Sequence, residues 1–185
     1  FMWTQYDDPG FMALASSTAA EAPIYARVGL NGMISDQPQR AFLPSGLPMM
    51  VLARTLWKSD LSFDQITADY FDSAFGPDGG QCREFLQKLS DSFDPKWLTA
   101  YSYRKKPTIP PEVPGRLQGV RKLVQDFRPV IERNINLPDA CQARSWRDLA
   151  AYADICEFLG EAIKGELEGD AKTARQHWDR IERLV

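Results

Sequence analysis

Apolar residues at helical spacing dominate the chain from about residue 47 to residue 185, and this pattern constrains the fold most. The clearest stripe repeats every three or four positions and consists of Leu117, Val120, Leu123, Val124, Phe127, Val130 and Ile131. Such a stripe predicts an amphipathic helix that buries one face. Pro129 lies within the stripe, and we expect it to kink or interrupt the helix.

Start and stop signals divide this region into several predicted helices. Pro48 suits the first turn of a helix that continues through the apolar run at residues 49–57. Ser62 and Gln65 have capping-box spacing, which predicts the start of the next helix. The Gly-Pro pair at residues 76–77 indicates that one helix ends there and another begins. The following helix carries a regular apolar set, namely Cys82, Phe85, Leu86, Leu89 and Phe93.

The C-terminal residues predict two antiparallel helices. Ser145 is interpreted as the N-cap of a long helix, and Gly169 followed by Asp170 as a stop and a new cap. Residues 145–185 therefore indicate a helical hairpin. The apolar pattern is still periodic at residue 185, so we expect the natural chain to extend further.

Two segments lack a clear helical pattern. Residues 94–114 are rich in aromatic residues and proline and are interpreted as a connection with local structure at best. The basic triplet at residues 104–106 is interpreted there as a solvated loop and not as an anion site. Residues 1–8 are short, aromatic and β-prone, and Asp-Asp-Pro-Gly at residues 7–10 indicates that this strand runs into a turn.

Residues 23–34 allow two interpretations. Pro23 suits the first turn of a short helix that Gly29 would stop. Asn-Gly at residues 31–32 is also a hairpin signal, and a hairpin would make residues 24–30 a strand. Leu30, Met33 and Ile34 could form a buried strand in either case, and periodicity alone leaves the choice open.

The composition is that of a globular chain and argues against several classes of protein. Of 185 residues, 44% are hydrophobic and 25% are charged, which matches the globular average. No apolar run approaches the roughly 18 residues that span a bilayer. The net charge of −3 argues against a nucleic-acid partner. No signal peptide is visible, so any such segment would lie upstream and the localisation stays open.

Cysteine and histidine are too few for the common metal and nucleophile sites. Three cysteines, with no pair at CxxC spacing, cannot close a set of disulfides, and Cys82 and Cys156 fall on apolar helix faces. We interpret these two as core residues. His177 is the one histidine, which excludes a histidine-rich metal site, and nothing near it supports a catalytic triad. We expect no cofactor and no metal.

Three segments resemble the C-terminal half of a large bacterial family of glycosidase-like proteins of uncharacterised activity. They are residues 32–57, 69–79 and 145–178. Within them, Tyr70-Phe71 followed by Phe75-Gly76-Pro77 is typical of that family, as is Gly169-Asp170 with Ala174 on the next helix. The resemblance implies a β/α barrel followed by a helical domain, an architecture similar to that of α-glucuronidases.

This resemblance implies a domain organisation for the chain. Residues 1–46 would be the last βα units of a TIM-type barrel, with strands near 1–8 and 30–37 and a helix near 11–29. Residues 47–185 would be a C-terminal helical bundle domain. A complete barrel needs about 250 residues, so this chain would be a fragment. The expected fold class is mainly α, with a small β/α remnant of a TIM-type barrel before the bundle.

The resemblance also implies candidate binding residues, because barrel sites lie just past the strands. They are Gln5, Tyr6, Asp7 and Asp8 after the first strand, and Asp36, Gln37 and Arg40 after the second. Carboxylates and amides bind sugar hydroxyls, an arginine can pair with a uronate carboxylate, and Trp3 or Tyr6 could stack on a sugar. Alternatively, residues 7–10 form only a turn and Arg40 pairs with a nearby acid.

We therefore expect a C-terminal fragment of a glycoside-hydrolase-like, carbohydrate-active protein. Its helical domain would pack on the barrel and could support a homodimer. Catalytic residues stay unassigned, since hydrolysis needs two carboxylates and absent strands would carry at least one, which leaves this chain inactive alone.

Two alternatives remain, namely a non-catalytic helical module that binds a protein or glycan, and a family member that binds sugar without cleaving it. Exposed apolar residues along 1–46 would favour the enzyme-derived interpretation, because a severed barrel edge leaves unburied strand surface. A polar, self-contained N-terminal region would favour the helical module.

Overall fold

The protein is seen here as a computed structural model that describes residues 7–32, 43–58, 60–102 and 108–184. These residues are mainly helical and contain no strand, which confirms the mainly α prediction. The helices are α1 (Met12–Arg27), α2 (Leu47–Trp57), α3 (Phe63–Phe75), α4 (Gly79–Phe93), α5 (Pro95–Ser102), α6 (Val113–Asn134), α7 (Ala140–Glu168) and α8 (Ala171–Glu182). A 3-10 turn, η2 (Gly76–Asp78), joins α3 to α4. No barrel remnant is seen in this part, and most of both expected strands falls outside it.

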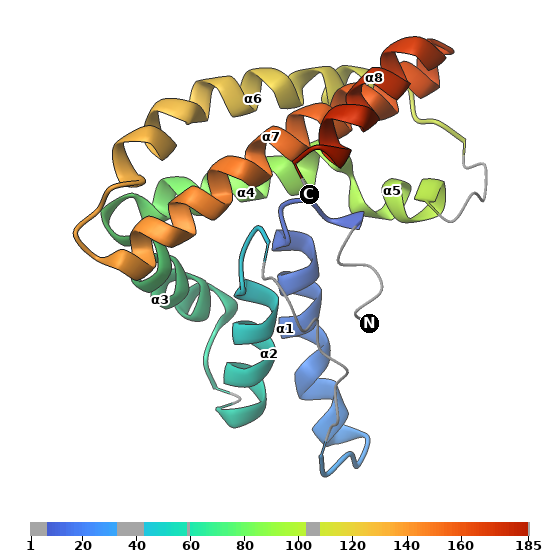
Figure 1. Ribbon diagram of the computed structural model, residues 1–185. Helices are drawn as coiled ribbons and strands as arrows, with labels where there is room; N and C mark the ends of the chain where they lie inside the picture. Colours follow the sequence, from blue (N-terminus) through green and yellow to red (C-terminus); the bar gives the residue numbers. More distant parts are fainter. Residues whose placement is uncertain (1–6, 33–42, 59, 103–107, 185) are drawn as a thin grey trace.

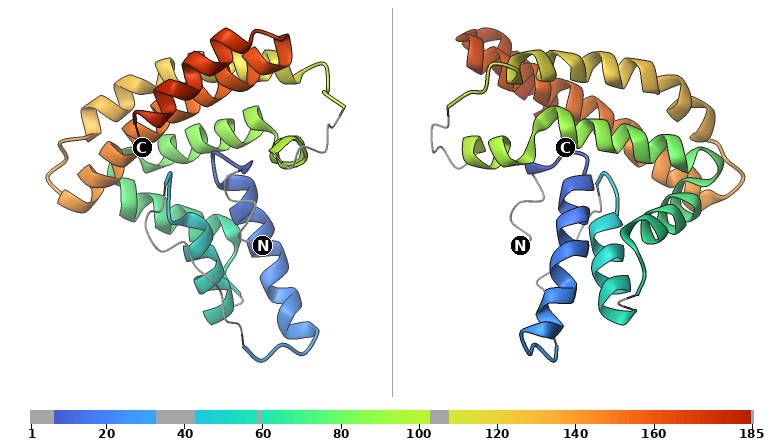
Figure 2. Two further views of the ribbon diagram at one scale, coloured as in Figure 1. Left: turned by 45° about the vertical axis from the view of Figure 1, so that its right-hand side comes forward. Right: turned by 180° about the vertical axis from the view of Figure 1, so that it is seen from behind.

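The helices form a bundle with a projecting arm. In the bundle, α6 and α7 lie side by side, α8 folds back on α7, and α3 and α4 pack beneath them (Figure 1). The arm consists of α1 and α2, which run in the same direction next to each other and point away from the bundle (Figures 1 and 2). No described helix is both long and apolar enough to cross a membrane.

An aromatic cluster around Trp146 holds the bundle together. Trp146 is fully buried, and its indole Nε1 donates to the backbone oxygen of Phe75 at 2.8 Å. Its ring meets that of Phe75 edge to face at 5.2 Å, and Phe127 lies 6.1 Å away. Phe127 stacks on Phe85 at 4.2 Å. These contacts tie α7 to α3, α6 and α4, and they bury the apolar stripes that the sequence indicated.

Most predicted helix ends are confirmed. Pro48 lies in the first turn of α2, and Ser62 forms a complete capping box with Gln65 at the start of α3. Gly169 ends α7 with a φ of 78°, a value that favours glycine. Asp170 then caps α8 by accepting a hydrogen bond from the Thr173 backbone. The predicted hairpin of α7 and α8 is therefore present, and local capping chemistry fixes its turn.

The predicted start of one helix and the predicted interruption of another are wrong. The long helix α7 begins at Ala140, because Asp139 caps it by accepting from two backbone N–H groups; Ser145 lies inside the helix. Helix α6 runs through Pro129 without interruption. Phe127 and Ile131 are buried in the same core on either side of the proline, and this packing offsets the missing hydrogen bond.

Two segments are more helical than the sequence suggested. Residues 94–114, expected to hold local structure at best, include α5, where Trp97 and Leu98 are buried. Helix α1 begins at Met12 and is continuous through Pro23, so the strand alternative for residues 24–30 is wrong, and so is the placement of Pro23 in the first turn of a helix. Its last turn is extended by a bond from the Val28 N–H to the oxygen of Ile24. This helix coincides with the one that the family resemblance implied over residues 11–29.

Candidate functional site

The predicted site residues divide into described and undescribed positions. Gln5, Tyr6, Asp36, Gln37 and Arg40, as well as Trp3 and the basic triplet at 104–106, lie outside the described residues. Asp7 and Asp8 are described, and both are buried, with 6% and 2% of their surface exposed. The candidate site is therefore described around these two residues, just before the N-terminus of α1.

Asp8 anchors the start of α1 to α4. One carboxylate oxygen accepts from the Leu14 N–H at 2.7 Å, and the other accepts from the Ser90 hydroxyl at 2.5 Å. The Met12 N–H donates in turn to the Ser90 oxygen at 3.2 Å. Burial raises the pKa of the Asp8 carboxyl, although these hydrogen bonds oppose the rise. Both carboxylate oxygens of Asp8 are thus engaged in holding the arm to the bundle, as the turn interpretation of residues 7–10 requires.

Gly10 allows the backbone at this point to lie directly against α4. A Cβ atom there would lie 1.9 Å from the backbone oxygen of Leu86 and 2.4 Å from the Ser90 hydroxyl oxygen. Any larger residue would force the two segments apart. Asp8, Gly10 and Ser90 therefore fix how the first turn of α1 meets the last turns of α4.

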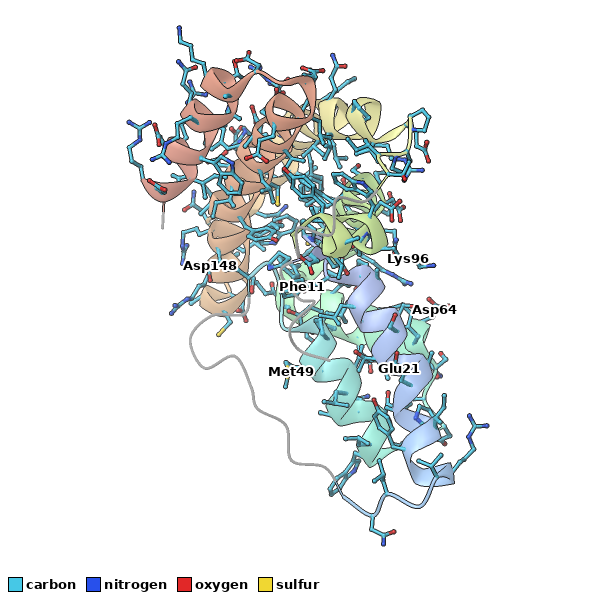
Figure 3. The ribbon with its side chains drawn as sticks, turned by 90° about the vertical axis from the view of Figure 1, so that its right-hand side faces the viewer. Phe11, Glu21, Met49, Asp64, Lys96 and Asp148 are labelled. Atoms are coloured by element: carbon cyan, nitrogen blue, oxygen red, sulfur yellow. The ribbon has the colours of Figure 1, made fainter. Side chains whose placement is uncertain are left out.

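An open groove of about 1220 Å³ lies beside this anchor. The side chains of Ser17, Glu21 and Tyr25 on α1 form one wall. Lys88 and Asp91 on α4 and Lys96 on α5 form the other. Figure 3 shows Lys96 above Glu21 on the side of the molecule that faces the viewer. Such a concave region with converging polar groups has the features of a ligand site.

The charges of the groove are mixed. Asp94 pairs with Arg116 at 3.3 Å, and Asp91 accepts from Gln87 at 3.0 Å. Among the residues that the structure describes, the ammonium groups of Lys88 and Lys96 have no partner. The carboxylate of Glu21 accepts from the Tyr25 hydroxyl at 3.5 Å. The groove thus offers unpaired ammonium donors on one wall and carboxylate acceptors on both, and its lining holds four acidic and three basic side chains.

Sequence reasoning missed this groove. The α1 wall has a signal in hindsight, because Ser17, Glu21 and Tyr25 follow at intervals of four and share one helix face. That signal is usable only if residues 12–27 are known to be one helix, which the sequence left open. The opposite wall depends on α5, which the sequence did not predict.

The described residues offer few other chemical centres. They contain no group of three or more histidine, cysteine or acidic side chains that could hold a metal. Burial raises the pKa of the Cys156 thiol to about 12 and that of Cys82 well above its usual value, so neither is a ready nucleophile. This confirms both as core residues. The ring of His177 on α8 lies 6.0 Å from the ring of Phe158 on α7, and no triad surrounds His177 among the described residues.

Comparison with known proteins adds no assignment: no protein family, no curated protein and no solved structure matches this chain. The fold and the groove are therefore the observations on which a function can be based.

Proposed function

We propose that this chain is the C-terminal part of a carbohydrate-active, glycosidase-like protein, and that another part of that protein covers the end of its arm. The observation that carries the proposal is the arm tip, the exposed apolar group where α1 and α2 end. Its members are Ile24, Val28, Leu30, Leu56 and Trp57. Trp57 has 92% of its surface exposed and Val28 has 68%.

The arm tip exposes more apolar side chains together than the isolated ones found on most protein surfaces. Single exposed apolar residues are common on soluble proteins, but a contiguous group marks an interaction surface. Here α1 and α2 end on the same side, away from the bundle (Figure 2), and the exposed apolar residues belong to the last turns of these two helices and the turn after α1. Ile24, Val28 and Leu30 also belong to residues 1–46, where the enzyme-derived interpretation expects exposed apolar residues, although they lie at the end of helix α1 and not on a strand edge.

The family resemblance supports the carbohydrate-active part of the proposal. On this proposal the parent barrel supplies the catalytic carboxylates, and the helical bundle is a packed support that positions the arm against the barrel. The chain alone would then be inactive. The arm tip could also be covered by a second copy, so a homodimer remains within the proposal.

The first test is the intact mass of the natural protein, captured from its source by antibody and measured by mass spectrometry. We expect a mass above 20.9 kDa by the roughly 200 residues that a complete barrel still requires. A natural protein of 20.9 kDa would overturn the proposal. If the mass is larger, glycoside hydrolysis screens are run on the natural protein and not on this chain.

The second test is oxidative footprinting of tryptophans in the natural protein and in this chain. We expect Trp57 to be oxidised rapidly in the isolated chain and to be protected in the natural protein, where the arm tip is covered. Trp146 is fully buried and serves as the internal control, because it should stay protected in both. Equal oxidation of Trp57 in both samples would contradict the covering of the arm tip.

The groove favours the second candidate function, a non-catalytic helical module that binds a protein or a glycan. Its lining comes from α1, α4, α5, α6 and the turns between them, so it needs no other body to complete it. A natural protein of 20.9 kDa would make this the leading interpretation.

A further inference from the structure

We propose that the groove between α1 and the α4–α5 junction binds a neutral oligosaccharide. The choice of a carbohydrate rests on the proposed function, whereas the location rests on the groove alone. The site is separate from any catalytic centre of a parent barrel. It would be a subsite that holds a glycan chain while chemistry occurs elsewhere, or the main site of a binding module.

The shape of the groove suits an extended ligand. Ser17, Glu21 and Tyr25 lie on successive turns of α1, and four residues advance a helix by about 6 Å. That spacing is comparable to the length of one sugar ring, so each turn can meet a different ring of a linear chain. The volume of about 1220 Å³ holds several rings. The groove is also open, as a chain that continues beyond the site requires.

The polar groups of the groove match hydroxyl groups. A sugar hydroxyl both donates and accepts, and the two walls offer the complementary functions. Glu21 accepts on one wall, and the ammonium groups of Lys88 and Lys96 donate on the other. The half-buried ring of Tyr25 adds an apolar face on which the C–H groups of a sugar ring can pack.

The charge balance argues for a neutral ligand. A strongly anionic ligand would meet Glu21 and Asp91, and a cationic ligand would meet Lys88 and Lys96. Of the remaining charged side chains, Asp94 and Arg116 are paired with each other, and both carboxylate oxygens of Asp8 accept hydrogen bonds from Leu14 and Ser90. A ligand without net charge can form hydrogen bonds with both walls and is repelled by neither.

The groove is held in shape before any ligand arrives. Its floor contains Asp8 and Ser90, whose hydrogen bond joins residues 82 positions apart in the sequence. Gly10 lies against the same turns of α4. Because this anchor fixes α1 relative to α4, little order has to be gained on binding, which favours affinity.

The test is isothermal titration calorimetry of the 185-residue chain with three probes, cellohexaose, xylohexaose and maltohexaose. We expect at least one of them to bind. Glu21→Ala and Lys96→Ala should each weaken that binding about tenfold, the scale of one hydrogen bond to a charged group. Both side chains are exposed, so circular dichroism should show unchanged folding.

Matched controls are available on surfaces away from the groove. Glu132→Ala on α6 and Lys172→Ala on α8 remove the same kinds of charge at exposed positions, and we expect both to bind like the parent chain. Binding that survives both groove variants would overturn the location while leaving the carbohydrate assignment intact. No binding of any probe would overturn the groove proposal, whereas the proposed function would still be judged by the intact mass and the Trp57 footprint.

Discussion

At Gly10 the backbone next to the arm packs so closely against the bundle that no side chain can be accommodated. An added Cβ would lie 1.9 Å from the Leu86 oxygen, which is a backbone atom of α4 and cannot rotate away. We therefore expect Gly10→Ala to lower the free energy of unfolding by about 1–3 kcal/mol or more, as overpacked sites do. Urea denaturation followed by circular dichroism measures the change.

Gly119→Ala is the matched control for this substitution. Gly119 lies in α6, and a Cβ atom added there would meet nothing within 4 Å, so alanine should stabilise the helix by about 0.5–1 kcal/mol. Equal effects of the two substitutions would show that the close approach at Gly10 is not a constraint on the fold.

Asp8 should give the protein a characteristic pH dependence. Its carboxyl has a reference pKa of 3.8 and a raised pKa in the folded chain because it is buried. Between these two values the folded state keeps a proton that the unfolded state has released. The free energy of unfolding therefore falls as pH rises through this interval and stays lower above it.

Asp8→Asn isolates this effect, because the amide has no proton to release and can still accept from the Leu14 N–H. We expect the stability of the parent chain relative to Asp8→Asn to fall as pH rises from about 3.5, measured by urea unfolding at each pH. Asp78, whose pKa is lowered by Arg133 and Asn134, acts equally in both proteins and cancels. A stability difference that does not change with pH would contradict the assignment.

At the scale of single elements, the start of α7 provides a direct comparison of two capping residues. The Asp139 side chain accepts from the N–H groups of Cys141 and Gln142. The Ser145 hydroxyl instead donates to the Cys141 backbone oxygen within the helix. We expect Asp139→Ala to destabilise the protein by about 1 kcal/mol. Ser145→Ala should change stability by no more than about 0.5 kcal/mol. Thermal unfolding of both variants measures the difference, and a larger loss at Ser145 would contradict the observed start of α7.

Helix ends could be predicted where the signal is local and complete. The capping box of Ser62 and the stop at Gly169 depend on residues within one turn, so the sequence identified both. The prediction for Ser145 was wrong because serine occurs both inside helices and as an N-cap, and the residue type alone does not distinguish the two positions. The helix start is set by Asp139, which caps α7 six residues earlier. Helix α5 was missed because it is stabilised by the burial of Trp97 and Leu98, which is a tertiary effect.

At the scale of the whole molecule, the core was more predictable than the site. The apolar stripes of α4 and α6 are buried as their spacing indicated. The groove depends instead on the contact between Asp8 and Ser90, which are 82 positions apart. No periodicity connects residues at that distance. The sequence thus indicated Asp8 as a candidate without indicating what it contacts, and it did not predict the α1 wall of the groove.

The arm and the bundle should differ in local stability. In α7, Leu149, Ala153 and Cys156 are almost fully buried and belong to the main core. The last turn of α1 lacks such cover, and Pro23 removes one backbone hydrogen bond just before it. We expect amides of residues 25–30 to exchange with deuterium at least about 100-fold faster than those of the buried α7 positions.

Hydrogen exchange measured by mass spectrometry on proteolytic fragments can test this difference, with the partly exposed α8 as an intermediate reference. Uniform protection across α1 and α7 would show that the arm unfolds only with the bundle. In the natural protein, the proposed cover over the arm tip should slow exchange at residues 25–30 and leave α7 unchanged, because binding stabilises only the segments that it orders. This comparison shows whether the end of the arm has low local stability in both proteins or is stabilised in the natural protein by another part of it.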